Sequence, residues 1–138
     1  MAVHSGLLRM QTAGDADVVD LTEGVRSIVA RSGVEAGLAA VFAVGATVGV
    51  TTIEYEPGAI ADFQALLDRI VPAAGEYEHN ALNHDTNAHS HLRAALIGPS
   101  ETIPIVGGEL GLGTWQQIVL VDFDDRPRER IVSVQVLS

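Results

Sequence analysis

The chain has 138 residues, the length of one domain, and a chain of this size buries roughly two thirds of its unfolded surface in a single core. Its formal net charge of -10 repels phosphate backbones, which excludes general nucleic-acid binding, and the absence of cysteine and lysine excludes disulfides, thiolate chemistry and Schiff-base mechanisms. Apolar residues make up 47% of the chain and the mean hydropathy is +0.25, values that argue against disorder and favour burial of some apolar surface between subunits.

The N-terminal half is predicted to contain three strands and one helix. Residues 3–12 alternate as in a half-buried strand, and residues 14–17 form a turn. Asp20 and Glu23 have the spacing of a capping box at the start of a helix that ends at Gly33. Residues 36–53 carry no charge over 18 positions, the lower limit for a membrane-spanning helix, but their glycines and β-branched residues favour two buried strands with a turn near Gly45.

The C-terminal half is predicted to contain two helices and three strands. Apolar residues between 60 and 70 share one helical face until Pro72, and residues 73–86 form a loop. Asn87 caps a helix that ends at Gly98. Three strands follow in hairpin-like succession, over residues 102–106, 116–123 and 130–137.

These elements predict one α+β domain over residues 1–138, with a largely antiparallel sheet and about three helices on one face. The N-terminus lacks the basic and apolar segments of a signal peptide, so we expect a cytoplasmic protein without a membrane partner.

Four of the five histidines lie between residues 79 and 91, and this clustering favours a site. If the third helix begins after His89, then His79, His89 and His91 converge and, with Glu54 as a carboxylate donor, suit zinc. If the helix includes His89, the side chains of His89 and His91 point about 200° apart, because each helical residue advances about 100°. These two histidines then share no ligand.

A second reading of the same stretch is a phosphate-handling site. The N-terminus of the third helix offers unpaired N–H groups, Ser90 and Arg93 add donors, and histidines are able to move protons near neutral pH. Structural roles are the alternative for several of these residues: a core position for Trp115, a solvated carboxylate for Glu54, and the surface for His4 and His84.

The segment Ser100-x-x-Ile103-x-Ile105-x-x-Gly108-x4-Gly113-Thr114-Trp115-Gln116-x-Ile118 resembles the signature of the YjbQ family, which is described as secondary thiamine-phosphate synthases. The resemblance extends to Thr51–Glu54, to Asn87–Arg93 and to the turn Arg126–Arg128, so that it covers nearly the whole chain. Two positions depart from the family pattern. Gly45-Ala46 stands where many members have a histidine-threonine pair, and Asp85-Thr86-Asn87 replaces Asp-Gly-Asn.

The resemblance implies an α+β homotrimer with its site near subunit boundaries. The activity that it implies joins a pyrimidine pyrophosphate to a thiazole phosphate, with magnesium, and releases pyrophosphate. In that reading Glu54, His79 and His91 are catalytic, and the phosphorylated substrate is bound by Asn87, Ser90, Arg93, Thr114, Trp115 and Gln116. The alternative is a trimer that binds a metal or an anionic metabolite without turnover.

Overall fold

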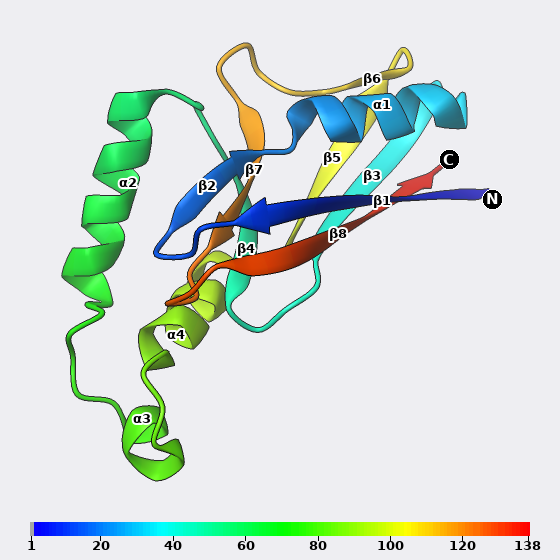
Figure 1. The fold of residues 1–138 in the computed structure, drawn as a ribbon. Coiled ribbons are helices and arrows are strands. Elements are labelled where there is room, and N and C mark those ends of the chain that lie inside the picture. The colour runs from blue at the N-terminus through cyan, green and yellow to red at the C-terminus, as the bar shows by residue number, and fades with distance from the viewer. Residues whose placement is uncertain (1) are drawn as a thin grey trace.

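Two antiparallel sheets organise the computed structural model, which describes residues 2–138. The five-stranded sheet has the order β1-β8-β3-β5-β6, and the three-stranded sheet has the order β2-β7-β4 (Figure 1). In chain order the elements are β1 (Val3–Thr12), β2 (Asp17–Asp20), α1 (Thr22–Ser32), β3 (Ala36–Ala43), β4 (Val48–Ile53), α2 (Pro57–Ile70), α3 (Glu78–Asn83), α4 (Ala88–Ile97), β5 (Ser100–Val106), β6 (Glu109–Leu110), β7 (Gln117–Asp122) and β8 (Arg128–Leu137).

The sheets and helices form layers around two hydrophobic clusters. The larger cluster lies between the two sheets and includes the buried face of α1. The smaller cluster lies on the other face of the three-stranded sheet, where α2 and α4 cover it. Strand β7 separates the clusters: Ile118 and Leu120 face the larger one, and Val119 and Val121 face the smaller one. Its uninterrupted apolar run therefore reflects burial on both faces.

No element of the chain within residues 2–138 covers the outer face of the five-stranded sheet. Residues that are paired across strands share a face, and one such row joins Val3, Leu137, Leu38 and Pro104 across β1, β8, β3 and β5. Val3 and Leu38 are exposed, whereas the neighbouring Val136 of β8 points to the core. This row is therefore apolar and open to solvent, whereas the next row on the same face, formed by Ser5, Gln135, Ala40 and Thr102, is mostly polar.

We expect Leu67→Ala to lower the free energy of unfolding by about 2–5 kcal/mol, because the side chain is fully buried in the smaller cluster and its removal leaves a cavity. Leu66→Ala is the matched control on the same helix. Leu66 is 44% exposed, and its loss is expected to cost under about 1 kcal/mol. Urea unfolding of both variants measures the difference, and equal losses would contradict this account of how α2 is held.

The predicted α+β class and antiparallel pairing are confirmed, but the pairing scheme is wrong in two places. The strands at 36–43 and 48–53 do not pair with each other, since β3 joins the five-stranded sheet and β4 joins the other. Likewise β7 and β8 form no hairpin, because the turn at Asp124–Arg128 carries the chain from one sheet to the other. Strands that follow one another closely in sequence were expected to pair as hairpins. Instead the chain crosses from one sheet to the other between them, and the strands bury their apolar faces between the layers.

Three local predictions also need correction. The expected loop at 73–86 contains the short helix α3, and the expected turn at 14–17 leads into β2. The capping box does not form, because Asp20 Oδ1 accepts from Thr22 N at 2.9 Å while Glu23 pairs with Arg26.

Among residues 2–138, no helix has both the length and the apolar character required to cross a bilayer.

Candidate functional site

The residues expected to form one site lie in two separate pockets. The histidine pocket is lined by Tyr77, Glu78, His79, Ala88, His91 and Leu92, and its volume is about 530 Å³. The tryptophan pocket includes Glu54, Tyr55, Thr114, Trp115 and Gln117, and its volume is about 500 Å³. Helix α3 lies at one end of the structure with α4 next to it, and the segment between β6 and β7 lies at the other end (Figure 1). The chain therefore does not bring the expected site residues together in one place.

The histidine pocket is built where α3 packs on α4. His79 lies in the first turn of α3 and His91 in the first half of α4. Their ring centroids are 4.7 Å apart and the rings are inclined by 57°. The sequence-based expectation that His79 and His91 work at one place is therefore compatible with the geometry.

The tautomer of His79 follows from its neighbours. Its Nε2 lies 3.3 Å from Asn87 Oδ1 and 3.7 Å from Asp85 Oδ2. Both neighbours are acceptors, so Nε2 is assigned as the donor to Asn87 Oδ1, and Nδ1 is left to face a ligand. This arrangement of an oriented histidine beside another histidine suits proton transfer.

His89 does not join these histidines. Helix α4 begins at Ala88, so His89 and His91 are both helical and diverge by about 200°. His89 is only 4% exposed, and its Nδ1 finds no hydrogen-bond partner within residues 2–138. The predicted zinc set of His79, His89 and His91 is therefore wrong for one subunit, and the described part of the chain contains no group of three or more histidine or acidic side chains placed to hold a metal.

We expect the stability of the protein to fall with pH below about 6.5, in part through His89. Burial, followed by the nearby positive charge of Arg93, lowers the pKa of His89 from its ordinary 6.5. Below that value the unfolded chain takes up a proton here more readily than the folded chain, so acid favours unfolding. His89→Gln is expected to reduce the loss of unfolding free energy between about pH 7.5 and pH 5.5, as measured by urea titration. His4→Gln, at an exposed residue, leaves that loss unchanged; equal losses in parent and His89→Gln would exclude the mechanism.

The predicted phosphate donors at the start of α4 have structural partners instead. Ser90 is fully buried and donates to the carbonyl oxygen of Phe123. Arg93 donates through Nε and Nη2 to the carbonyl oxygen of Val71, at 2.9 and 2.8 Å. Ala88 N donates to Asn80 Oδ1 at 3.0 Å, which satisfies the first helical N–H. This terminus is therefore a packed junction, and the expected anion site is not open there.

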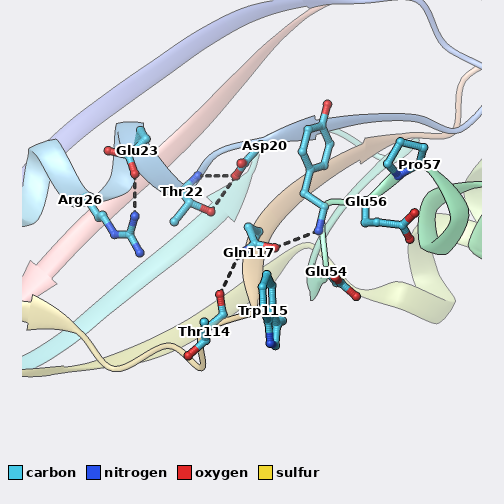
Figure 2. Close-up of a pocket in the computed structure, with 11 residues that line it drawn as sticks. Asp20, Thr22, Glu23, Arg26, Glu54, Glu56, Pro57, Thr114, Trp115 and Gln117 are labelled. Atoms are coloured by element: carbon cyan, nitrogen blue, oxygen red, sulfur yellow. Dashed lines mark hydrogen bonds and ion pairs between the residues drawn. The ribbon is translucent and has the colours of Figure 1, made fainter.

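The tryptophan pocket is formed where the end of β4 meets the segment before β7 (Figure 2). Gln117 joins the two, because its Oε1 accepts from Tyr55 N at 2.9 Å and its Nε2 donates to the carbonyl oxygen of Thr114 at 3.5 Å. Glu54 and Trp115 are exposed beside this bridge. Trp115 is therefore no core residue, contrary to the structural alternative for a tryptophan in a glycine-rich segment.

Gln116 lies outside this pocket, and residues that the sequence analysis missed line it. Gln116 accepts from Gly113 N at 3.0 Å and donates to Thr52 Oγ1 at 3.1 Å, so it shapes the turn before β7. Asp20, Tyr55 and Gln117 were not expected at a site. Trp115 lies in the turn before β7 rather than in the strand, so strand alternation gave no signal for Gln117.

A buried polar network connects the two sheets beside β7. Arg130 donates to both oxygens of Asp122, at 2.6 Å from Nε and 2.8 Å from Nη2, and Asp124 accepts from Arg128 at 2.8 Å. Burial alone would raise the pKa of Asp124, but the N–H of Asp125 and the Arg128 guanidinium lower it to about 2. Asp124 is therefore part of the buried network as well as of the turn between β7 and β8.

Gly45 borders this network rather than either pocket. A Cβ atom at Gly45 would lie 2.9 Å from Arg130 Nη1, and the φ angle of this residue is +155°. The residue that replaces the family histidine thus lies against the guanidinium that joins the two sheets.

These features define a small two-sheet α+β protein with an uncovered sheet face and two separate pockets. The sequence profile described as UPF0047 protein YjbQ-like matches residues 7–138. A UPF0047 protein of Methanothermobacter thermautotrophicus is 36% identical over 136 residues, which cover 99% of this chain and 93% of that protein. A UPF0047 protein of Mycobacterium tuberculosis H37Rv is 40% identical over 117 residues, which cover 83% of this chain and 84% of that protein.

Solved structures agree with this match. The crystal structure of a YbjQ-like protein of unknown function from Sulfolobus solfataricus P2 has a TM-score of 0.94 and 31% identity, and the match covers 99% of this chain and 98% of that chain. An uncharacterised YjbQ/UPF0047 protein from Clostridium acetobutylicum has a TM-score of 0.87 and 35% identity, with 96% and 99% covered. The chain therefore belongs to the YjbQ-like UPF0047 family.

Proposed function

We propose that the chain is a cytoplasmic transferase of the thiamine-phosphate synthase type, which joins a pyrimidine pyrophosphate to a thiazole phosphate. The pairing of His79 with His91 in one pocket carries the proposal, because a substitution at a pyrophosphate ester needs a group that stabilises or protonates the leaving oxygen. The family resemblance supplies the substrates.

The reaction requires one bond to break and one to form. The bond between the pyrimidine methylene carbon and the pyrophosphate oxygen breaks, and its electron pair leaves with pyrophosphate. The lone pair of the thiazole nitrogen forms the new carbon–nitrogen bond. In this proposal a protonated His79 or His91 donates to the departing oxygen, while Asn87 holds the imidazole of His79 in place through Nε2.

Magnesium fits this pocket better than zinc does. Mg²⁺ is commonly held by one or two carboxylates together with substrate phosphates, and Glu78 lines the pocket while Asp85 lies beside His79. Bound magnesium would supply charge neutralisation for the pyrophosphate. Zinc finds no such fit, because His89 diverges from the other two histidines.

A homotrimer is part of the proposal. The exposed apolar residues on the uncovered sheet face, such as Val3 and Leu38, support self-association, since exposed apolar patches mark interfaces. In our proposal the trimer places the tryptophan pocket of one subunit beside the histidine pocket of the next, so that Glu54, Thr114 and Trp115 complete the site. Light scattering after size exclusion measures the assembly, and a monomer at micromolar concentration would overturn this part.

The activity is tested by incubating the purified protein with both substrates and magnesium and measuring thiamine phosphate by chromatography. We expect product above the protein-free control and its loss in His91→Ala. Glu54→Gln is expected to be inactive alone, and refolding it together with His91→Ala is expected to restore part of the activity in mixed trimers. Absence of product from the parent, or a His91→Ala variant equal to the parent, would contradict the proposal.

Binding without turnover is the second candidate. It is favoured by the closed N-terminus of α4, where Ser90 and Arg93 are already engaged, and by Gly45 in place of the family histidine. A carrier or sensor would show a thermal shift with pyrophosphate and magnesium but no product. The product assay and the thermal-shift assay together therefore separate the two candidate functions.

A further inference from the structure

The tryptophan pocket presents aromatic and acidic groups together at the surface. Trp115 is 72% exposed and Tyr55 is 46% exposed, although both are large side chains that proteins normally bury. The two residues come from different elements, since Tyr55 follows β4 and Trp115 precedes β7, and the Gln117 bridge holds these segments together. The exposed rings are thus attached to a fixed base rather than to a free loop.

The charge of the pocket is negative, and one carboxylate remains free. The lining contains Asp20, Glu23, Glu54 and Glu56 against a single cation, Arg26, which pairs with Glu23 at 2.6 Å. Glu56 accepts from Gly58 N and Ala59 N at the start of α2, and these hydrogen bonds lower its pKa, so it stays ionised.

Asp20 uses one oxygen on Thr22, through the backbone N–H and the hydroxyl. The Glu54 carboxylate, by contrast, has no hydrogen-bond or ion-pair partner anywhere in residues 2–138, and Figure 2 shows it near Trp115 at the pocket. It is the group in this pocket that remains available to a ligand.

We propose that the tryptophan pocket binds an organic cation, of the quaternary ammonium or alkylated amine class. A ring face attracts such cations, and Trp is the best of the aromatic side chains for this purpose. The free Glu54 carboxylate supplies the opposite charge, and the volume of about 500 Å³ admits a small molecule. The surrounding carboxylates disfavour an anion at this pocket, so in the proposed trimer the phosphates of the substrate would lie toward the histidine pocket instead.

The lining favours an organic cation over a metal ion. Without substrate phosphates to complete its shell, Mg²⁺ or Ca²⁺ requires several protein oxygens that converge at about 2.0–2.6 Å, and no group of three or more acidic side chains placed to hold a metal exists within residues 2–138. Two of the carboxylates are also occupied, Glu23 by Arg26 and Glu56 by the α2 N-terminus. Quaternary ammonium ions are weakly hydrated, need no converging ligands and gain from an aromatic surface. The inference concerns the ligand class of this pocket and does not depend on turnover in the histidine pocket.

The test uses Trp115 as its own probe, because it is the only tryptophan of the chain. The full-length protein is titrated with choline and, separately, with 3,3-dimethyl-1-butanol, a neutral molecule of the same shape, while tryptophan fluorescence is recorded. We expect choline to change the emission and to bind at least about tenfold more tightly than the neutral molecule. Added sodium chloride should weaken choline binding, because salt screens the attraction.

Two acidic variants make the test specific. Glu54→Gln keeps the shape of the side chain and is expected to weaken choline about tenfold without changing the affinity for the neutral molecule. Glu129→Gln, at an exposed residue of β8, removes the same charge elsewhere and is expected to leave choline affinity unchanged. Equal affinity for choline and its neutral counterpart, or equal weakening in both variants, would overturn the proposal.

A second reading of the exposed indole is burial against another copy of the chain. Sedimentation velocity at the concentrations of the titration decides between the two occupants. Choline binding at unchanged sedimentation supports the cation site. A blue-shifted emission that follows the degree of association and ignores choline would overturn it. Failure of the synthase assay has no bearing on either result, since fluorescence reports the tryptophan pocket alone.

Discussion

Replacing Arg130 by methionine is expected to lower the free energy of unfolding by about 3–5 kcal/mol. The guanidinium holds both oxygens of Asp122, whose side chain is fully buried, and Nη2 also donates to Thr47 Oγ1 at 2.7 Å. Methionine fills much of the same space but donates nothing, so the variant leaves a carboxylate in the core with fewer partners. The cost comes mainly from that uncompensated charge rather than from lost packing.

Urea unfolding measures the loss, and Arg128→Met is the matched control. Arg128 also pairs with a buried aspartate, Asp124, but its own side chain is 41% exposed, so water partly replaces the lost partner. We expect its loss to be under about half that of Arg130→Met. A double variant, Arg130→Met with Asp122→Leu, should recover part of the stability, because no buried charge is left alone. A loss below about 1 kcal/mol for Arg130→Met would show that this network is not a support of the fold.

The element types were readable from the sequence because they follow from local chemistry. Alternation along 3–12 and 130–137 indicated strands that bury one face, and β1 and β8 do so. The sheet that each strand joins could not be read, because β3 and β4 are apolar whichever layer they enter. Their separation depends on side chains far away in sequence, such as Arg130, which closes the space next to the Gly45 turn.

In the candidate site too, local geometry was predictable from the sequence, whereas contacts with distant segments were not. Helical geometry predicted that His89 and His91 diverge if the helix includes both, and the start of α4 at Ala88 settled that condition. The partners of Ser90 and Arg93 lay beyond prediction, since the carbonyl oxygens of Phe123 and Val71 are supplied by segments more than twenty residues away. A side-chain donor in such a motif is available to a ligand only if no other segment of the fold already accepts its hydrogen bond.

Replacing His79 by glutamine is expected to lower kcat of the proposed synthase by about 10²–10⁴-fold, the usual effect of losing a positioned acid or base. Glutamine reaches a similar length and retains a donor for Asn87 Oδ1, but it exchanges no proton near neutral pH. The substitution therefore removes proton transfer with little change in packing. If His79 acts only as the bond to pyrophosphate breaks, kcat and kcat/KM fall together and KM stays nearly constant.

Steady-state kinetics of thiamine phosphate formation provide the measurement, with His4→Gln as the control for removing an exposed histidine elsewhere. A rise in KM at constant kcat would assign His79 to substrate binding instead. In the proposed mechanism His91 shares this role, because its ring lies 4.7 Å from that of His79 and both rings lie where α3 meets α4. His79→Gln and His91→Gln combined should then cost less than the product of the two single losses, since residues that act as one unit are not additive.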